Sequence, residues 1–491
     1  MADDKTERAE GAPASKGAAR GRIARQAYVL IHGMGEQRPM DTVKGFARTI
    51  WSLDPDVQVP KMPHAEQMWS RPDNRTGSLE LRRITTRKSR ASDSFPKGVR
   101  TDFYELYWAD LTAGSTWAQF TAWVQYLLVR PWSKVPADVR TAWLCLWIGA
   151  LIVTALGLVS LIPDEIWKAH APSWLSKAIV AALAAAILAF MHRKATASFG
   201  RVVKYTRSDP DNIAARKAVR ERGLALLREL HAGNGQETNY DRVVLVGHSL
   251  GTILAHDLVS YFWAEQIGVQ VFSAASAKGQ AIASLEAAVA EIKLAPSMEN
   301  IAVFREAQGR LGRILREASN VAEIRSRWLI SDLVTVGSPL THAEFLLADG
   351  PDDLKARCRA RELPTCPPFR EELDPQVAEA ARRAGLLPDG QTRLMSHRIS
   401  ETPEAWALHF AAPFASVRWT NVFDPARRVA QGDMISGPLR KNFGMGILDL
   451  NISDGDRPSR EFTHTRYWDA DKTAAARLKT LRRAINLLDR N

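Results

Sequence analysis

The sequence predicts an α/β protein, because short apolar runs typical of buried strands alternate with segments of helical periodicity. The clearest strand-like runs are 27–31, 243–245 and 333–336, and each is followed within two residues by a glycine. Helical periodicity over 213–231 precedes the second run, and a helical stretch over 252–259 follows it. At 491 residues the chain is long enough for one large domain that carries insertions.

The segment 246–251 reads Val-Gly-His-Ser-Leu-Gly and places a Gly-x-Ser-x-Gly pattern between a strand and a helix. In a turn this tight, the residues two before and two after the serine, Gly247 and Gly251, must lack a bulky side chain. The hydroxyl of Ser249, which follows His248 at the tip of the turn, is then held clear of the sheet. The amino end of the new helix points at the same place, so Ser249 is a candidate nucleophile.

This motif resembles the nucleophile elbow of the α/β-hydrolase superfamily, and within it that of the serine lipases and esterases. A second motif adds to the resemblance, because His32-Gly33 follows the strand-like run 27–31 at once, as a His-Gly turn does in those enzymes. The resemblance implies a mostly parallel central sheet. It also implies an oxyanion hole made by the backbone N–H groups of Met34 and Leu250. The alternative is that the His-Gly turn only closes a strand.

The chain order in this superfamily is serine, acid, histidine, so the base is expected near the carboxyl end. The histidines that follow the candidate nucleophile are His256, His342, His397, His409 and His464. The last of them, His464, lies just before a predicted helix at about 472–488. The run His-Thr-Arg-Tyr-Trp that it begins resembles the histidine loop of some lipases. We therefore expect His464 to be the base, the alternative being a packed structural histidine.

Two aspartates compete for the role of the acid that orients this base. Asp424 directly follows the predicted strand 417–423, and Asp433 lies in the loop after it. Related hydrolases often have Asp-x-Val or Asp-x-Ile after this strand, which favours Asp433, and Asp424 remains the alternative. The aspartate that is not the acid would stabilise a turn. Ser338 is not expected to be a nucleophile, because it lacks the second glycine of an elbow and is followed by proline.

Residues 141–161 form an apolar stretch without a charged side chain. A helix of this length is about 31 Å long and spans the hydrocarbon core of a bilayer. A second apolar stretch, 174–191, is rich in alanine, which suits helix contacts in lipid, and its only charged residue is Lys177. Two crossings keep both halves of the hydrolase on one side, so we expect a two-helix transmembrane hairpin. The alternative is a helical hairpin buried in a soluble cap domain.

The charges around the predicted hairpin determine its expected orientation. Basic residues flank it on both sides: Arg130, Lys134 and Arg140 before it, and Arg193, Lys194, Arg201 and Lys204 after it. The loop between the two stretches contains Asp164 and Glu165 against Lys168. The positive-inside rule predicts a multi-pass protein of the cell membrane with the hydrolase facing the cytoplasm. The apolar, aromatic stretch 117–132 is expected either to lie along the interface or to belong to the core.

Composition narrows the expected partners. The formal net charge is +12, yet the chain has none of the signatures of nucleic-acid-binding folds, so nucleic acid is not an expected partner. The basic cluster 82–90 is expected to form a solvated loop, able to contact anionic lipid headgroups. Cys145, Cys358 and Cys366 are too few for a disulfide framework and form no metal-ligand pattern. We therefore expect a reducing compartment, no metal and no cofactor.

These observations predict the organisation of the chain. We expect a disordered tail over 1–25, the first part of the hydrolase domain over 26–112, and the interfacial helix and hairpin over 113–200. The second part of the hydrolase domain then covers 201–491. Within it, the polar and proline-containing residues 351–400 are expected to be an insertion, such as a lid or a surface flap.

The function that follows is that of a membrane-anchored serine hydrolase, which cleaves carboxylic (acyl or lipid) esters through a Ser–His–Asp triad and an acyl-enzyme. Its expected partners are the ester substrate and the bilayer. Two alternatives remain open. One is a catalytically inactive membrane scaffold with the hydrolase fold, and the other is an acyltransferase that uses the same triad.

Overall fold

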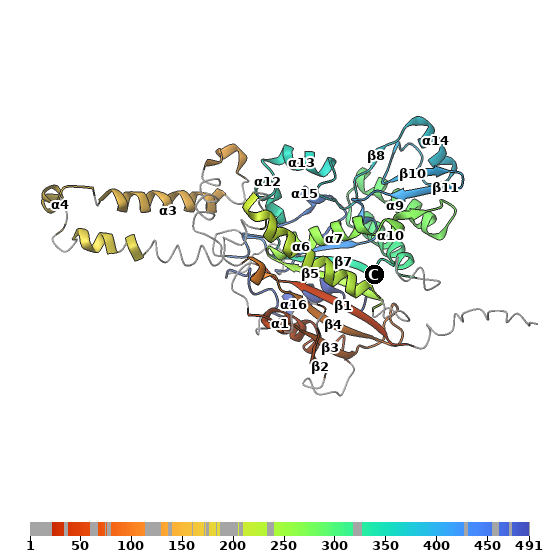
Figure 1. Ribbon diagram of the computed structural model, residues 1–491, viewed down its shortest axis with the longest axis horizontal. Helices are drawn as coiled ribbons and strands as arrows, with labels where there is room; N and C mark the ends of the chain where they lie inside the picture. Colours follow the sequence, from red (N-terminus) through yellow and green to blue (C-terminus); the bar gives the residue numbers. More distant parts are fainter. Residues whose placement is uncertain are drawn as a thin grey trace, which may run out of the picture.

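The structure of the protein is a computed structural model that describes most of the chain (Figure 1). The residues described are 22–33, 38–58, 67–73, 75, 80–112, 129–135, 140–159, 161–170, 172, 176–182, 184–186, 205, 210–232, 240–317, 327–426, 431–453, 461–470 and 474–490. The predicted disordered tail over 1–25 lies almost entirely outside these residues, and so does most of the predicted interfacial stretch 117–132.

An eight-stranded sheet forms the centre of the molecule, in the order β13-β12-β7-β5-β1-β4-β3-β2. The strands from β13 to β4 are all parallel to their neighbours, and β3 and β2 continue the sheet in antiparallel pairing. The prediction of an α/β protein with a mostly parallel sheet is therefore confirmed. The strands are β1 (Ala24–Ile31), β2 (Met68–Pro72), β3 (Arg82–Lys88), β4 (Val99–Leu106), β5 (Arg242–His248), β7 (Ile330–Val336), β12 (Arg418–Phe423) and β13 (Leu448–Asn451).

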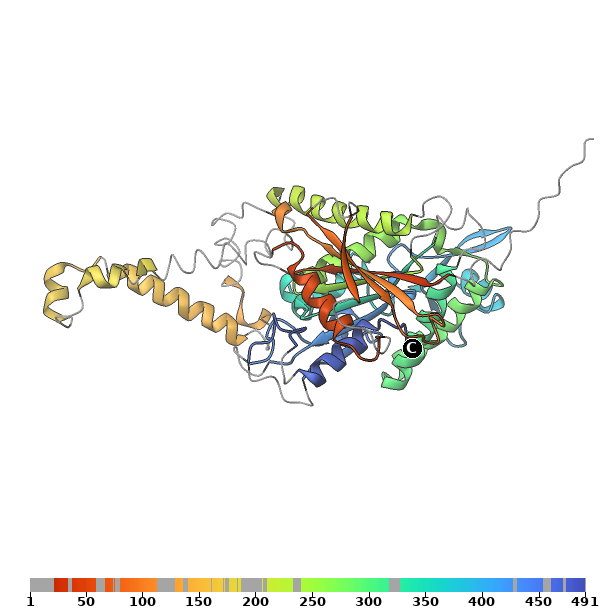
Figure 2. The ribbon, with the colours of Figure 1, turned by 90° about the horizontal axis from the view of Figure 1, so that it is seen from below.

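The central strands are apolar on both faces, as parallel strands covered by helices must be. Alternate residues of β1 and β5 join two separate core clusters. One cluster includes side chains of α6 (Pro210–His231), α7 (Gly251–Glu265), α9 (Ala277–Leu294) and α10 (Met298–Arg316). The other includes side chains of α1 (Asp41–Ala47), η2 (Arg48–Ser52) and α16 (Ala475–Ile485). Figures 1 and 2 show the sheet between these two layers.

Shorter elements complete the described part of the fold. They are η4 (Ala109–Thr112), η5 (Trp132–Lys134), α8 (Ile267–Gln270), β6 (Val271–Phe272), η7 (Pro339–His342), α12 (Ala343–Leu346), α13 (Pro351–Arg359), β8 (Glu371–Glu372), α14 (Pro375–Arg383), β9 (Arg393–Leu394), β10 (Ser396–Glu401), β11 (Glu404–Leu408), η8 (Pro413–Ala415) and α15 (Arg440–Phe443).

The basic cluster 82–90 is not the solvated loop that its composition indicated. Most of it is β3, which pairs with β2 and β4 and buries Ile84, Thr85 and Thr86. Arg83 lies near the carboxylate of Asp102 on β4, at 3.7 Å. The prediction was wrong because the β-branched residues in the middle of the cluster favour a strand, and partners distant in the sequence accept its charge.

Residues 351–400 pack into the body of the molecule and do not form a loose surface flap. Ala381, Leu386 and Met395 are almost fully buried in the larger core cluster. The buried guanidinium of Arg370 pairs with the buried carboxylate of Glu286 on α9, at 3.0 Å. The segment is thus tied to the core by both apolar and ionic contacts.

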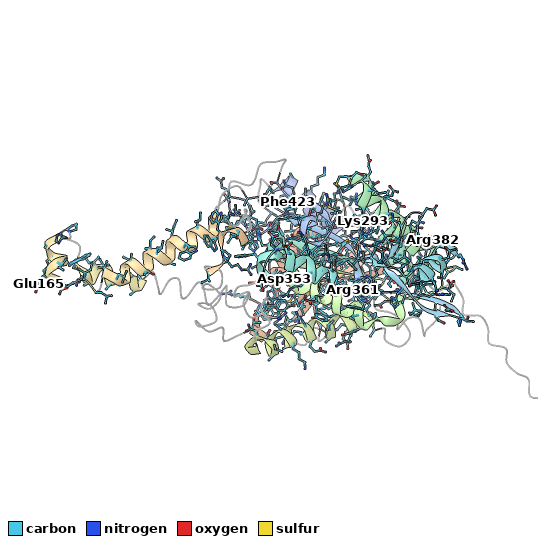
Figure 3. All side chains as sticks on the ribbon, turned by 90° about the horizontal axis from the view of Figure 1, so that it is seen from above. Glu165, Lys293, Asp353, Arg361, Arg382 and Phe423 are labelled. Atoms are coloured by element: carbon cyan, nitrogen blue, oxygen red, sulfur yellow. The ribbon has the colours of Figure 1, made fainter. Side chains whose placement is uncertain are left out.

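The helices α3 (Arg140–Val159) and α4 (Asp164–His170) extend away from the body as an arm (Figures 1 and 2). Glu165 lies at its far end (Figure 3). Within the described residues, no single helix has both the length and the apolar character needed to cross a membrane. The pair Trp147–Val159 and Asp164–His170 meets both criteria jointly, but it is bent by 113°. The second predicted span, 174–191, is described only in part, and the transmembrane hairpin stays a prediction.

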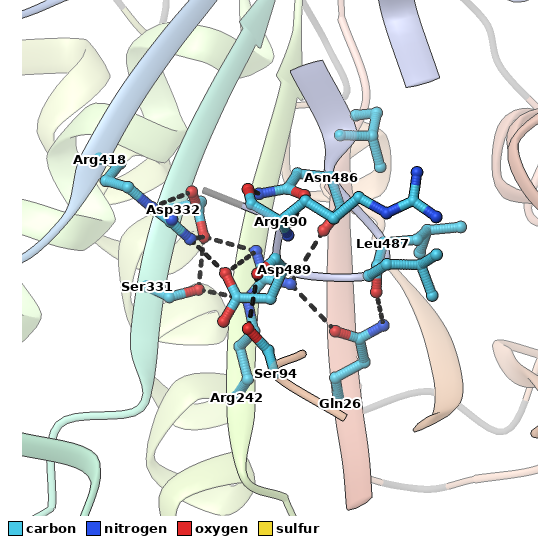
Figure 4. A network of polar contacts seen from close by, with 12 residues as sticks. Gln26, Ser94, Arg242, Ser331, Asp332, Arg418, Asn486, Leu487, Asp489 and Arg490 are labelled. Carbon is cyan, nitrogen blue, oxygen red and sulfur yellow. Dashed lines mark hydrogen bonds and ion pairs between the residues drawn. The ribbon is translucent and has the colours of Figure 1, made fainter. Parts of the chain in front are cut away.

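A buried ionic network lies where β5, β7 and β12 begin (Figure 4). The carboxylate of Asp332 on β7 forms ion pairs with the guanidinium groups of Arg242 on β5, at 2.6 Å, and of Arg418 on β12, at 2.9 Å. The carboxylate of Asp489, which follows α16, forms an ion pair with the same guanidinium of Arg418 at 2.5 Å. Burial alone would raise the pKa of Asp332, but the two arginines lower it far below its ordinary value. The network therefore joins three strands to the carboxyl-terminal segment through ionised groups.

We predict that Asp332→Asn lowers the free energy of unfolding by about 3 kcal/mol at neutral pH, because it leaves two buried guanidinium groups short of a partner. The depressed pKa gives a stabilisation that is complete above the ordinary aspartate pKa. The stabilisation decreases as the pH falls below that value. The difference in the free energy of unfolding between Asp332→Asn and the wild type therefore narrows below about pH 4. Denaturant titration across this pH range measures the effect.

The matched control is Glu372→Gln, which breaks an ion pair with Arg393 in which both side chains are more than half exposed. This variant should stay within about 0.5 kcal/mol of wild type. Equal losses in the two variants would contradict a special role for the buried network.

Candidate active site

The turn between β5 and α7 holds Ser249 in a backbone conformation that few residues adopt. Its φ angle is 53°, in the left-handed region, which costs a residue other than glycine about 1–2 kcal/mol. The Ser249 N–H donates to the carbonyl of Val336 on β7 at 3.0 Å, and the N–H of Thr252 donates to the Ser249 carbonyl at 2.9 Å. Strand β7 and the first turn of α7 therefore hold the serine from both sides.

The two predicted elbow glycines, Gly247 and Gly251, are required by close backbone contacts. A Cβ atom on Gly251 would lie 2.2 Å from the carbonyl oxygen of Ile31, at the end of β1. A Cβ atom on Gly247 would lie 2.7 Å from the Cα of Thr252. The glycines thus let the strand, the turn and the helix approach each other more closely than side chains permit.

His464 connects Ser249 to an aspartate, as the sequence predicted for a base. Its Nε2 atom lies 2.8 Å from the Ser249 hydroxyl oxygen, and its Nδ1 atom lies 2.9 Å from an oxygen of Asp433. All three side chains are buried. When Nδ1–H donates to the carboxylate, a neutral ring leaves Nε2 free to accept the serine proton. The arrangement is therefore able to perform general base chemistry.

Asp433 is held by more than the histidine. The hydroxyl of Tyr467 donates to it at 2.7 Å, and the N–H of Ile435 donates to its other oxygen at 3.0 Å. Burial alone would raise the pKa of Asp433. The hydrogen bonds from His464, Tyr467 and Ile435 outweigh burial and lower this pKa below its usual range. Asp433 is therefore ionised at neutral pH.

Asp424, the other candidate acid, supports the loops around the triad. It is fully buried and accepts a hydrogen bond from the hydroxyl of Thr463 at 2.7 Å, one residue before His464. Its backbone carbonyl accepts the N–H of Asp433 at 3.1 Å. The structure therefore places Asp433 against the histidine ring and Asp424 against the neighbouring threonine.

A short backbone pairing explains why Asp433 and His464 meet. The N–H of Gly432 donates to the carbonyl of Glu461 at 3.0 Å, and the N–H of Thr463 donates back to the carbonyl of Gly432 at 3.1 Å. The two loops are thereby aligned residue by residue. The next residue in each loop, Asp433 or His464, is a member of the candidate triad.

The predicted His-Gly turn lies against the nucleophile. A Cβ atom on Gly33 would be only 2.6 Å from the Cβ of Ser249. The ring of His32 stacks on Trp108, and the Trp108 indole N–H donates to the His32 carbonyl at 3.1 Å. Leu250 is the residue before α7, where helical N–H groups have no partner within the helix. Met34, the other predicted oxyanion donor, lies outside the described residues.

Two further residues, His248 and Gly337, shape the site. His248 donates from Nε2 to the carbonyl of His464 at 2.7 Å, and burial, followed by the charge of His464, lowers the pKa of His248 to about 3. It is therefore neutral and fixes the backbone of the base. Gly337, with a φ of 60°, lies where a Cβ atom would be 2.9 Å from the Tyr467 ring and 3.2 Å from Asp433.

The sequence did not assign roles to Gly337 and Tyr467, although signals for both were present. Gly337 directly follows a buried strand, and Tyr467 lies three residues after His464. Ser338 bonds to Thr252 at 2.8 Å and caps η7. His256 and His409 each donate to a backbone carbonyl, of Pro364 and Phe369 respectively, as packed structural histidines do.

Within the described residues no group of histidine, cysteine or acidic side chains is arranged to hold a metal ion. Cys358 and Cys366 are free thiols. Burial raises the pKa of Cys366 to about 12, so this thiol stays protonated at neutral pH.

We predict that Gly251→Ala disrupts the turn, because the new methyl group would overlap the backbone oxygens of Ile31 and His32. The expected loss is about 3 kcal/mol or more in the free energy of unfolding. Gly268→Ala is the matched control, since nothing lies within 4 Å of its Cβ position. Thermal unfolding of both variants tests the claim. A Gly251→Ala protein as stable as Gly268→Ala would contradict it.

Comparison with known proteins identifies no relative of this chain. No protein-family model, no curated protein and no solved structure matches it.

Proposed function

We propose that the protein is a serine hydrolase that cleaves acyl esters at a membrane surface. One observation carries the proposal: Ser249, in a left-handed turn between strand and helix, is hydrogen-bonded to His464, which is hydrogen-bonded to Asp433. These contacts join three segments that lie far apart in the sequence. A buried serine that serves only structure needs neither a strained backbone nor a base held by an ionised acid.

The proposed mechanism follows from the roles that these contacts allow. His464 removes the proton from Ser249 as the serine oxygen attacks the ester carbonyl. The N–H groups of Leu250 and Met34 stabilise the resulting oxyanion. His464 then gives its proton to the leaving alcohol, and an acyl-enzyme forms. A water molecule activated by the same histidine releases the acid, while Asp433 stabilises the imidazolium in both steps.

We also propose that the domain has the α/β-hydrolase fold. The support is that β5 lies inside the sheet, between β1 and β7, and that Ser249 follows its carboxyl end. Open parallel sheets bind their ligands outside the carboxyl ends of the strands. The loops that carry Asp433 and Gly33 follow β12 and β1, so they approach the serine at the same edge.

We propose that the arm is part of the membrane anchor, a two-helix hairpin formed by 141–161 and 174–191, with the hydrolase in the cytoplasm. Its support is a set of exposed aliphatic side chains along α3: Leu144, Ile148, Leu151, Ile152 and Leu158. Soluble surfaces rarely carry apolar patches of this extent. The basic residues that flank the arm in the sequence favour a cytoplasmic body.

Contacts at the base of the arm place it beside the candidate active site. Val135 and Trp143 pack with Phe345 of α12, and the guanidinium of Arg130 lies 4.7 Å from the Phe345 ring centroid. Helix α12 follows β7 and η7 in the chain, and His342 is the last residue of η7. The ring of His342 donates a hydrogen bond to the carbonyl of Met434 at 3.2 Å. Met434 adjoins the candidate acid. An anchored arm would therefore hold the triad near the lipid surface.

The triad proposal predicts a difference between the two aspartates in the hydrolysis of p-nitrophenyl esters. Asp433→Asn should lower kcat by about 10³–10⁴-fold, because the amide favours the wrong tautomer of His464. Asp424→Asn is the matched control and should retain kcat within about tenfold, since Asp424 bonds to Thr463 and Asp433 bonds to the ring of His464. Circular dichroism checks that both variants fold. If Asp424→Asn lost more kcat than Asp433→Asn, the acid would be Asp424 and the proposal would have named the wrong residue.

The same assay separates hydrolysis from acyl transfer. Adding a primary alcohol to the ester reaction offers the acyl-enzyme a second acceptor. We expect free acid as the main product, as measured by chromatography. A product that is mostly the new ester would identify an acyltransferase, whereas a folded protein with no turnover and no bound acyl group would favour the scaffold alternative.

The anchor proposal predicts that charges on α3 release the protein from vesicles. Ile148→Asp together with Ile152→Asp should reduce co-flotation with phosphatidylcholine vesicles more than tenfold, since each carboxylate costs about 3 kcal/mol within a bilayer. Ile399→Asp is the control, because Ile399 is 49% exposed on β10 of the body. The rate at which these variants hydrolyse a water-soluble ester should equal that of the wild type. Flotation that survives both substitutions on α3 would contradict the role of the arm.

A further inference from the structure

A cavity lies at the opposite edge of the sheet from Ser249. Its volume is about 950 Å³, and its walls come from α10, α16, the residues after α16 and the first residues of β7 and β12. The side chains of Arg418 and Asp332, which belong to the buried ionic network, form part of its wall. Strand β5 separates the two edges by about 20 Å, at ~3.3 Å per residue. The cavity is therefore independent of the proposed ester site.

Positive charge predominates in this cavity. Four of its basic side chains form no ion pair with any carboxylate in the described part of the chain: Arg305, Lys479, Arg483 and Arg490. Two other basic lining residues are paired, since Arg418 binds Asp332 and Arg482 lies 3.8 Å from Asp54. The remaining carboxylates of the wall, Asp56 and Glu306, balance only part of the unpaired charge.

Arg305 is the innermost of the unpaired cations. It is half-buried and donates to the carbonyl of Trp419 at 2.8 Å and to the hydroxyl of Thr420 at 2.9 Å. Burial, followed by repulsion from Arg418, lowers the pKa of Arg305 to about 10, so it is still charged at neutral pH. An anion near this guanidinium would relieve both effects.

Aliphatic side chains form another part of the wall. Ile50, Ile301, Leu448 and Leu487 contribute to it. Ligand sites typically combine such walls with a few fixed polar groups, and this volume lies within their usual range. A small inorganic anion would leave most of the space unfilled.

We propose that this cavity binds a small molecule with a phosphate group and an apolar group. Arginine and lysine side chains bind the phosphate, since both are the usual partners of phosphate oxygens. The apolar group lies against the aliphatic wall. The same chemistry occurs in a soluble phosphate ester and in a phospholipid headgroup with part of its chain, and binding measurements separate the two.

The test uses the full-length protein in detergent, with inorganic phosphate and hexyl phosphate as probes in isothermal titration calorimetry. Hexyl phosphate should bind at least about tenfold more tightly than inorganic phosphate, because it also buries apolar surface. The double variant Lys479→Gln with Arg483→Gln should weaken hexyl phosphate binding at least tenfold, since each lost charge-assisted hydrogen bond is worth about that factor. Both side chains are exposed at the rim, so these changes leave the core intact.

The matched control is Arg383→Gln on α14, which removes an exposed arginine far from the cavity lining and should leave binding unchanged. Absence of hexyl phosphate binding in folded wild-type protein would overturn the proposal. Equal binding by wild type and the double variant would also overturn it.

Vesicles separate the two sources of the ligand. Phosphatidylcholine vesicles with and without phosphatidic acid are compared for the wild type and the double variant. A preference for phosphatidic acid that the double variant loses would identify a lipid headgroup as the ligand. Hexyl phosphate binding without such a preference would identify a soluble phosphate ester.

Discussion

The close crossing of three backbone segments at the end of β5 is the constraint on which the candidate site depends. Gly251 lies against the end of β1, Gly33 lies against Ser249, and Gly337 lies against Tyr467 and Asp433. None of these three positions has room for a Cβ atom. Glycine at each of them allows the serine, the His-Gly turn and the candidate acid to lie close together. The left-handed backbone of Ser249 is stable only because β7 and α7 fix it from both sides.

The elements around this crossing were predictable from the sequence because their signals are local. Strands β1 and β5 contain continuous apolar runs, and Ser249 is marked by glycines two residues away on each side. The local Asp-x-Ile pattern favoured Asp433 over Asp424 but left the alternative open, since both follow β12. The choice depends on the pairing of Gly432 with residues 461–463, which joins loops distant in the sequence. The basic cluster 82–90 was misassigned for a similar reason, because its partners are on β2 and β4.

The two edges of the parallel sheet carry different chemistry. At the carboxyl edge lie the candidate triad and, through Phe345 of α12, the base of the arm. At the amino edge lie the ionic network of Asp332 and Asp489 (Figure 4) and the basic cavity. The strands between the two edges are longer than any side chain, so no side chain reaches from one edge to the other. Each edge is therefore free to bind its own ligand.

The most direct test of the central claim is covalent labelling of the full-length protein with a fluorophosphonate, followed by mass spectrometry of the modified peptide. A serine activated by a base reacts with this probe, whereas an ordinary serine does not. The account predicts a single modification on Ser249 that disappears in His464→Ala and is unaffected in Ser338→Ala. Modification of another serine, or no modification of a folded wild-type protein, would contradict it.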